Sequence, residues 1–510
     1  MDTGTSTLSD AVDLAHHVNT KSRSRHPSPL KDIVSYMGYE GMISLAGGLP
    51  HPSLFPLNKT TFECLDPSAD KADGVILRLG RGSDPADLDL TQFLQYGSGA
   101  GNKGLIALCR ELTTVVHTPP YNFECLLHPG NTNAWDKVVG LLCEDDDYVL
   151  VEEYTYPSAQ ALWIPLGIKA APIAADGEGI QPSSLREILQ NWDEKIRGAR
   201  RPRTLYIVPV GSNPTGTSIS FDRRKEIYSI CVEYGKTILS DHWSHTHNEA
   251  VDIIIVEDDP YYFLQYPGYK QTGSKSKIST KDFLSDLSPS FLSMDTQGRV
   301  IRLESFSKTL FPGLRLGYFV ANPIFTERLL RATETETQDP AGLSQAFVLS
   351  LLSSWGIDGY LLWLQHLQEQ YRLRRDWLLD AFHQHFVVNH TGPEETACVS
   401  HPEMNSHIPV FSYVDPGAGM FVWAKFHFRG VKRFAEIASD GNDPDPEQSF
   451  ADEMWRAMID ELVLLTPGSY YHPWQGADNK TTKARGAEAQ TAHFRFSFAT
   501  PTSTSTDLGS

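Results

Sequence analysis

The sequence predicts an α/β protein with a mostly parallel central sheet, helices on both faces of that sheet, and a second, smaller α+β domain. Three observations lead to this fold class. Continuous apolar runs, typical of strands buried on both faces, occur at 148–153, 204–210, 252–260 and 299–307. Helical patterns such as 221–234 separate these runs. Strands of alternating polarity then follow a long helix in the last third of the chain.

The composition is that of an ordinary globular protein and excludes several classes of partner. The 510 residues allow two or three domains. A net charge of −19 repels phosphate backbones, so we expect no nucleic-acid partner. No apolar run approaches the roughly 18 residues of a membrane helix, so we expect no membrane partner. The 6 cysteines form no CxxC pair and indicate free thiols, and without a targeting signal at either end we expect a cytoplasmic protein.

The chain divides into three predicted parts. Residues 1–60 form a polar N-terminal arm and part of a small domain, and residues 61–345 form the large domain. Residues 346–510 form the small C-terminal domain. In the large domain a helix is expected at 101–112, and in the small domain helices are expected at 357–385 and near 447–461, with strands within 411–426 and 492–498.

Small, polar or aromatic residues follow five predicted strands. These segments are GNTNAW after 126–129, YTYP after 148–153, GSNPTG after 204–210, EDDPYYF after 252–256 and SFSK after 299–304. Ligands of open α/β sheets bind at the carboxyl ends of the strands. The five segments are therefore predicted to form one functional site.

Lys308, in SFSKTLFPGLRLGY, has several possible roles. A phosphate-loop lysine needs GxxxxGK[ST], and no glycine precedes Lys308. The SxxK of penicillin-interacting serine enzymes needs SDN and KTG, which the chain lacks. A third role is covalent binding of pyridoxal phosphate, whose phosphate group Ser305, Ser307 and Arg315 would bind. A lysine on a solvated loop is the remaining alternative.

Residues at the other strand ends favour the third role. Asp258 can keep a pyridine nitrogen protonated, because a carboxylate beside that nitrogen raises its pKa. Tyr261 and Asn213 can donate hydrogen bonds to the ring's 3-oxygen, and Tyr156 can cover the ring face. The GNTN segment at 130–133 precedes a predicted helix and offers N–H groups to a phosphate.

These motifs together resemble a known enzyme family. They are SLAGGLPHPSLFP, SNPTG, EDDPYYFLQY, SFSKTLFPGLRLGY and PGAGMFVW, in family order. The chain is similar to fold-type I, class I pyridoxal-phosphate aminotransferases, in the branch of the fungal aromatic-amino-acid and the kynurenine/2-aminoadipate aminotransferases. The similarity runs from about residue 22 to residue 499. It implies a central sheet of the seven-stranded type and a homodimer.

The resemblance also implies a role for each matching residue. Lys308 would hold pyridoxal 5'-phosphate and move a proton, and Asp258 would pair with the ring nitrogen. The other implied cofactor contacts are Tyr261 and Asn213 at the 3-oxygen, Tyr156 on the ring face, and Asn131, Thr132, Ser305, Ser307 and Arg315 at the phosphate. Tyr96 would reach the phosphate of the neighbouring subunit.

The implied substrates are an L-amino acid, by resemblance aromatic, and a 2-oxo acid. Arg495 would bind the substrate α-carboxylate with both guanidinium nitrogens, assisted by Asn213, and Gly48 lies where the family's arm closes over the substrate. The implied reaction is transamination in two half-reactions through pyridoxamine phosphate. Alternatives are another pyridoxal-phosphate reaction (decarboxylation or elimination), a non-catalytic regulator, and a catalytically impaired variant.

The chain departs from the family between a predicted helix and a predicted strand. The segment 235–251, GKTILSDHWSHTHNEAV, stands where the family passes directly from one to the other. Its histidines (His242, His245 and His247) lack the helical i, i+4 spacing of a zinc site, so no metal is predicted. Codons for Gly-Lys-Thr and Ala-Val at its two ends can contain a splice donor and a splice acceptor. We therefore hypothesise that the segment is a retained intron.

The second departure is at the C-terminal end. The family follows the strand of Arg495 with a helix, whereas this chain continues as TPTSTSTDLGS at 500–510. We expect an apolar face of the small domain to be exposed in consequence, with lower stability or solubility than in a helix-containing version.

The intron hypothesis makes a prediction about the transcript. Sequencing of cDNA across the codons for Tyr234 and Asp252 should reveal a shorter, in-frame form that lacks all but one codon of the segment between them. Transcripts that all contain the segment would contradict the hypothesis.

Overall fold

The structure is a computed structural model. It describes residues 8–27, 36, 39–43, 45–46, 48–68, 74–82, 88–234, 252–269, 279–392, 396–402, 409–477 and 480–499. The segment 235–251 and the tail 500–510 lie outside the described residues, so both hypotheses about them stay predictions.

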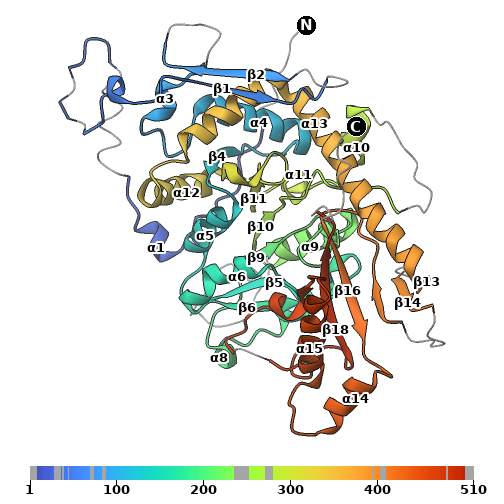
Figure 1. The fold of residues 1–510 in the computed structure, drawn as a ribbon. Helices are drawn as coiled ribbons and strands as arrows, with labels where there is room; N and C mark the ends of the chain where they lie inside the picture. Colours follow the sequence, from blue (N-terminus) through green and yellow to red (C-terminus); the bar gives the residue numbers. More distant parts are fainter. Residues whose placement is uncertain are drawn as a thin grey trace, which may run out of the picture.

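A central sheet of 7 strands forms the middle of the large domain, as expected (Figure 1). Its strands, in spatial order, are β4 (Glu124–His128), β12 (Gly317–Ala321), β11 (Val300–Ser305), β10 (Ile254–Asp258), β9 (Thr204–Ile207), β5 (Tyr148–Glu152) and β6 (Lys169–Ile173). Strand β12 is antiparallel to both of its neighbours, and all other pairs are parallel. The predicted strands at 148–153, 204–210, 252–260 and 299–307 are thereby confirmed.

Helices cover both faces of this sheet, because each strand is apolar on both sides. One face packs on α4 (Lys103–His117), α7 (Pro182–Gln190), α9 (Phe221–Glu233), α10 (Thr280–Asp286) and α11 (Phe291–Met294). The other packs on α5 (Asn131–Leu142), α6 (Pro157–Trp163) and α12 (Pro323–Glu336). The side chains between the sheet and the first group of helices form a first core, and those on the other face form a second core. Successive strand residues alternate between the two: Leu205 and Ile207 lie in the first core, and Tyr206 lies in the second. This alternation decides which side chains of a strand can reach the site.

The N-terminal region lies against the large domain. The helices η1 (Ala15–His17) and α1 (Thr20–Arg23) precede a 3-10 turn, η2 (Pro52–Leu54), and a small sheet of β1 (Lys59–Cys64), β2 (Val75–Gly80) and β3 (Leu88–Asp89). The amide of Asn19 donates to the carbonyl of Cys143 at 2.5 Å, and His16 and His17 each lie within 2.8 Å of Asp252 Oδ1. These contacts fix the first described residues to α5 and to the amino end of β10.

The long helix α13 (Gly342–His385) connects the large domain with the small sheet (Figure 1). It contains the expected helix 357–385 and begins earlier, with a non-helical residue, Gly356, at its kink. In length and composition α13 would suffice to cross a membrane. Its residues Leu351, Leu361 and Leu364 are buried in the first core, so we interpret α13 as a core helix.

The small domain is built on a sheet of 6 strands. In spatial order these are β13 (Val387–Thr391), β14 (Thr396–Ser400), β15 (Phe411–Tyr413), β16 (Phe421–His427), β18 (Thr491–Ser497) and β17 (Thr466–Pro467), with α14 (Lys432–Ser439) and α15 (Pro446–Asp460) beside them. This confirms the expected strands and the helix near 447–461. Leu462 and Leu464, just beyond α15, are exposed.

The remaining short elements of the described chain connect these parts. They are α3 (Thr91–Leu94), η3 (Ile164–Leu166), β7 (Ala175–Asp176), β8 (Gly179–Ile180), α8 (Glu194–Arg197), η4 (Pro312–Leu314) and η5 (Gly468–Tyr471). The division at residues 60 and 345 stays a prediction.

Candidate functional site

The carboxyl ends of the parallel strands bring several predicted residues to one edge of the central sheet. Asp258 is the last residue of β10, and Lys308 lies in the turn that follows β11. Asn213 follows β9, and Tyr156 follows β5 immediately before α6. The predicted meeting of these segments rests on the parallel pairing of β5, β9, β10 and β11, which the structure contains.

Asp258 is buried and held through both of its carboxylate oxygens. The Asn131 amide donates to Oδ1 at 2.6 Å, and the Tyr206 hydroxyl donates to Oδ2 at 2.7 Å. Burial raises the pKa of Asp258, while these two hydrogen bonds act in the opposite direction. The carboxylate therefore has a fixed orientation within the second core.

Asn131 was predicted to bind a phosphate, and the structure gives its side chain a different contact. Its amide nitrogen donates to Asp258 and also to the carbonyl of Leu303, at 3.0 Å. Asn131 is also the first residue of α5, whose N-cap Gly130 supplies no side chain. Asn131 can therefore offer its backbone N–H, and not its side chain, to an anion.

A group of hydrogen-bond donors lies where α5 begins. The Arg315 guanidinium donates to Ser307 Oγ at 3.3 Å and to the carbonyls of Pro129 and Pro312, each at 3.2 Å. Gly130 has a φ of +97°, and a Cβ there would clash with Arg315 Nη2. Only glycine lets Arg315 approach the helix N-terminus so closely. The arginine, the hydroxyls of Ser305 and Ser307 and the helix N-terminus suit a doubly charged anion.

Lys308 is half-buried and directly follows Ser307 in the turn after β11. Burial lowers the pKa of its amine, and the positive charge of Arg495 lowers that pKa further. Its amine makes no hydrogen bond or ion pair with any residue of the described chain. An amine in such surroundings is a good nucleophile and a good proton acceptor.

Arg495 lies on β18 of the small domain and faces the large domain. Its Nη1 donates to Asn213 Oδ1 at 2.6 Å and its Nη2 to Thr466 Oγ1 at 3.3 Å. The guanidinium carbon lies 4.2 Å from the ring centroid of Phe421 and 5.3 Å from that of Tyr471. Arg495 Nε is buried and has no partner among the described residues. This cation suits a carboxylate bound between the two domains.

Two further tyrosines lie close enough to Arg495 to act on its charge. Tyr261 is buried and meets Phe421 edge-on, with ring centroids 5.8 Å apart. Burial and the Asp258 charge raise the pKa of its phenol, and Arg495 opposes them. Tyr156 is 36% exposed and can therefore present a ring face to a ligand.

Thr132 is exposed on the first turn of α5, near the donors around Arg315. Two other predicted residues are not brought to this site within one chain. Tyr96 is 63% exposed in the loop after α3, and Gly48 is exposed, with nothing within 4 Å of a built Cβ. Roles for Tyr96 and Gly48 therefore depend on another subunit or on a movement of the N-terminal region.

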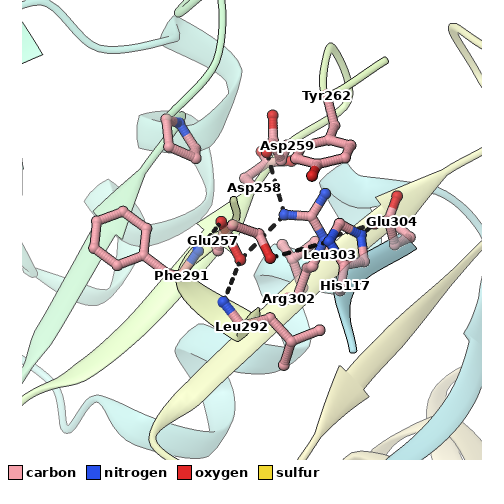
Figure 2. A network of polar contacts seen from close by, with 12 residues as sticks. His117, Glu257, Asp258, Asp259, Tyr262, Phe291, Leu292, Arg302, Leu303 and Glu304 are labelled. Carbon is pink, nitrogen blue, oxygen red and sulfur yellow. Dashed lines mark hydrogen bonds and ion pairs between the residues drawn. The ribbon is translucent and has the colours of Figure 1, made fainter. Parts of the chain in front are cut away.

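A buried ion network lies directly behind Asp258, on the other face of the sheet (Figure 2). Arg302 Nη1 lies 3.1 Å from Glu257 Oε2 and 3.2 Å from Asp259 Oδ2. Arg302 Nε lies 2.6 Å from Glu304 Oε1, which also lies 3.2 Å from His117 Nε2. The network ties β10 to β11.

The charges in this network are fully enclosed. Glu257 accepts hydrogen bonds from the backbone N–H groups of Phe291 and Leu292, and the Tyr262 ring lies 4.7 Å from the Arg302 guanidinium carbon. Burial acts to raise the pKa of Glu304, but the Arg302 charge and the His117 contact outweigh it and bring that pKa to about 2. Glu304 is thus an anion in the folded protein at neutral pH.

Tyr206 and Arg302 are residues around the site that no sequence motif marks. Tyr206 stands inside TLYIVPV and Arg302 inside RVIRLES, and both appear there as ordinary strand residues. Strand alternation was the available signal: Arg302 shares a face with Glu257 and Asp259 once β10 and β11 are paired in parallel. That signal requires the pairing register, which the sequence alone did not supply.

Comparisons with known proteins agree with this geometry. The family model described as "Aminotransferase class I and II" matches residues 93–507. An aromatic amino acid aminotransferase of Schizosaccharomyces pombe is 36% identical over 474 residues, covering 90% of each chain. An L-tyrosine:2-oxoglutarate aminotransferase of Serpula lacrymans is 35% identical over 476 residues, covering 90% of this chain and 84% of its own. Aminotransferase Aro8 from Candida albicans has a similar solved structure, with a TM-score of 0.80, 32% identity, and coverage of 97% of this chain and 95% of that chain.

The enclosed network predicts a large cost for removing its cation. Arg302→Met should lower the free energy of unfolding by about 3–5 kcal/mol, because it leaves buried carboxylates without a counter-charge. Urea unfolding measures the difference. Arg433→Met is the matched control, since Arg433 pairs with Glu453 on the exposed surface, and it should change stability little. Equal effects of the two substitutions would contradict the account.

The lowered pKa of Lys308 predicts how its amine titrates. A lysine amine reacts with acylating reagents only when it is deprotonated, so the midpoint of the reactivity–pH curve follows its pKa. Arg495→Gln removes a neighbouring positive charge and should move the Lys308 midpoint to higher pH. Mass spectrometry of the protein without cofactor, labelled at several pH values, gives that midpoint. Arg433→Gln should leave it unchanged, and a midpoint that falls or stays constant in Arg495→Gln would be inconsistent with this electrostatic coupling.

Proposed function

The chain belongs to the class I and II aminotransferases, and on that premise we propose that it transfers the amino group of an aromatic L-amino acid to a 2-oxo acid, with pyridoxal 5'-phosphate as its cofactor. The relatives named aromatic amino acid aminotransferase and L-tyrosine:2-oxoglutarate aminotransferase support both the reaction and the aromatic preference. Each covers most of its own length in the comparison, so the similarity extends over the whole catalytic unit.

The observation that carries the proposal is the position of Lys308. Its half-buried amine has no partner among the described residues, and Lys308 directly follows Ser307, whose hydroxyl accepts a hydrogen bond from Arg315. The amine also lies close enough to Arg495 for that charge to lower its pKa. A phosphorylated aldehyde bound at Arg315 and an amino acid bound at Arg495 would therefore both reach the same amine. This arrangement matches what a covalently bound cofactor and its substrate need.

The residues present fit pyridoxal 5'-phosphate. The guanidinium of Arg315, the hydroxyls of Ser305, Ser307 and Thr132, and the backbone N–H of Asn131 would hold its phosphate. Asp258 would pair with the pyridine nitrogen, Tyr261 and Asn213 would donate to the 3-oxygen, and Tyr156 would cover one ring face. When bound, the cofactor supplies an electron-withdrawing ring that stabilises negative charge at the substrate α-carbon.

Residues of the chain itself would orient the substrate and transfer the proton. Arg495, held by Asn213 and Thr466, orients the substrate through its α-carboxylate. The free Lys308 amine takes the α-proton and returns a proton during the transfer, for which its lowered pKa is suited. One amino acid enters and its 2-oxo acid leaves before the second 2-oxo acid enters, so the kinetics are of the ping-pong type.

The aromatic preference has local support around Arg495. Phe421 and Tyr471 flank its guanidinium, and Tyr154 continues the aromatic surface through contacts with Trp423 and His493. Apolar ring faces beside a carboxylate-binding cation favour substrates with large, flat side chains.

A homodimer in the cytoplasm is also proposed. Tyr96 and Gly48 are exposed in one chain, and a second copy would give them a partner: the phosphate of the neighbouring site for Tyr96 and the bound substrate for Gly48. All 6 cysteines are free thiols, which suits a reducing compartment.

The proposal predicts both the loss of activity on removal of Lys308 and the order of substrates. Lys308→Ala should lower the rate of transamination by about 1000-fold or more, since the variant lacks both nucleophile and base. Lys432→Ala, a change of an exposed lysine in α14, should leave the rate unchanged.

The substrate panel comprises tyrosine, phenylalanine, tryptophan, kynurenine and 2-aminoadipate as amino donors, each with 2-oxoglutarate and with phenylpyruvate. Tyrosine and phenylalanine should give the highest kcat/KM. Activity in Lys308→Ala equal to that of the unmodified protein would refute the proposed chemistry, and a preference for 2-aminoadipate would refute the aromatic assignment alone.

A further inference from the structure

Tyr206 is a buried residue of β9 that neither the sequence motifs nor the proposed chemistry uses. It is 2% exposed and lies opposite Val256 of β10 in the parallel register, two residues before Asp258. Strand alternation places Tyr206 and Asp258 on the same face, within the second core. Its hydroxyl donates to Asp258 Oδ2 at 2.7 Å.

The rest of the ring lies in apolar surroundings. The Tyr206 ring lies 4.6 Å from Trp135 and 6.5 Å from Trp163, centroid to centroid. A phenylalanine would fill this space equally well. The hydroxyl has one hydrogen bond in the described chain, to Asp258, so that bond is what distinguishes tyrosine from phenylalanine at this position.

We propose that Tyr206 is a positioning residue that, by hydrogen bonding to Oδ2, fixes the Asp258 carboxylate and keeps it an acceptor for a protonated pyridine nitrogen. The inference rests on the proposed function, because it requires that nitrogen to lie beside Asp258. Asn131 makes the equivalent contact with Oδ1, so each oxygen of the carboxylate has one donor.

One proton is shared between the pyridine nitrogen and Asp258, and the donors to Asp258 decide where that proton resides. A buried carboxylate without donors is strongly basic and would take the proton from the ring nitrogen. A donor to each oxygen stabilises the anion and makes it less basic, so the proton stays on nitrogen. A protonated ring withdraws electrons well, whereas an unprotonated ring beside a neutral acid does not. Tyr206 thereby acts on the reaction through Asp258, without touching the substrate.

Nuclear magnetic resonance of pyridoxal 5'-phosphate labelled with 15N in the ring reads this proton directly. In the unmodified protein the bound cofactor should give the signal of a protonated nitrogen. In Tyr206→Phe the signal should move toward that of an unprotonated nitrogen. The value of kcat should fall about 10- to 100-fold, since one pKa unit of carboxylate basicity corresponds to a factor of ten, while KM for the amino acid changes little.

Tyr228→Phe is the matched control. The Tyr228 hydroxyl also donates to a buried aspartate, Asp295 Oδ1 at 2.9 Å, at the opposite end of the sheet. The substitution Tyr228→Phe removes the same kind of hydrogen bond and should leave both the 15N signal and kcat unchanged. A second comparison uses Asp258→Asn, whose amide cannot take the proton as a carboxylate does. Adding Tyr206→Phe to that variant should have no further effect on the 15N signal.

The outcomes separate the inference from the proposed function. If the unmodified protein does not bind the cofactor, the proposed function fails. If it binds the cofactor with a protonated nitrogen, and Tyr206→Phe gives the same signal, the role of Tyr206 is overturned while the function stands. An equal shift in Tyr228→Phe would also overturn it. Should Tyr206→Phe not fold, Tyr206→Met, which also lacks a donor, takes its place with the same expectations.

Discussion

The ion pairs of Arg302 with Glu257, Asp259 and Glu304 are the interaction on which the site depends. They join β10 to β11 on one face of the sheet, and because strand residues alternate, they force Asp258 onto the other face. The same pairing directs the end of β11 into the turn that carries Lys308. Enclosed charges without partners are costly in free energy. A shifted register would leave several of these charges unpaired, so the observed register is strongly favoured.

The residues of the site are held with unequal rigidity, because some lie within the large domain and one comes from the small domain. The strand residues Asp258 and Tyr206 and the first residue of α5, Asn131, are fixed to one another by hydrogen bonds at the second core. Arg315 packs closely against Gly130 at the start of α5. Arg495 comes from the small domain and meets the large domain through its hydrogen bond to Asn213. Movement of the small domain would therefore change the carboxylate-binding end and leave the anion-binding end intact. Lys308 follows Ser307, the hydrogen-bond partner of Arg315, and its amine is close enough to Arg495 for that charge to lower its pKa.

The sequence was sufficient for the strands and for the segments that follow them. Long apolar runs identify buried strands, and the rule that ligands bind at strand carboxyl ends then gathers Asp258, Asn213 and Lys308 without any coordinates. Partners across strands were not predictable, because Tyr206 and Arg302 look like ordinary strand residues until the register of β9, β10 and β11 is known. The contact of the Asn131 amide with Asp258 was not predictable either, because a helix N-terminus suggests a bound anion and not a neighbouring side chain. The contacts expected for Tyr96 and Gly48 lie beyond a single chain.

We propose that Lys308 holds the cofactor covalently, opposite Asp258. Borohydride reduction of the protein with bound pyridoxal 5'-phosphate makes the bond between lysine and cofactor permanent, and mass spectrometry of the digested protein then locates it. We expect one stoichiometric phosphopyridoxyl group per chain, on Lys308. A modification on any other lysine, or an equal distribution over exposed lysines such as Lys432 and Lys195, would contradict it.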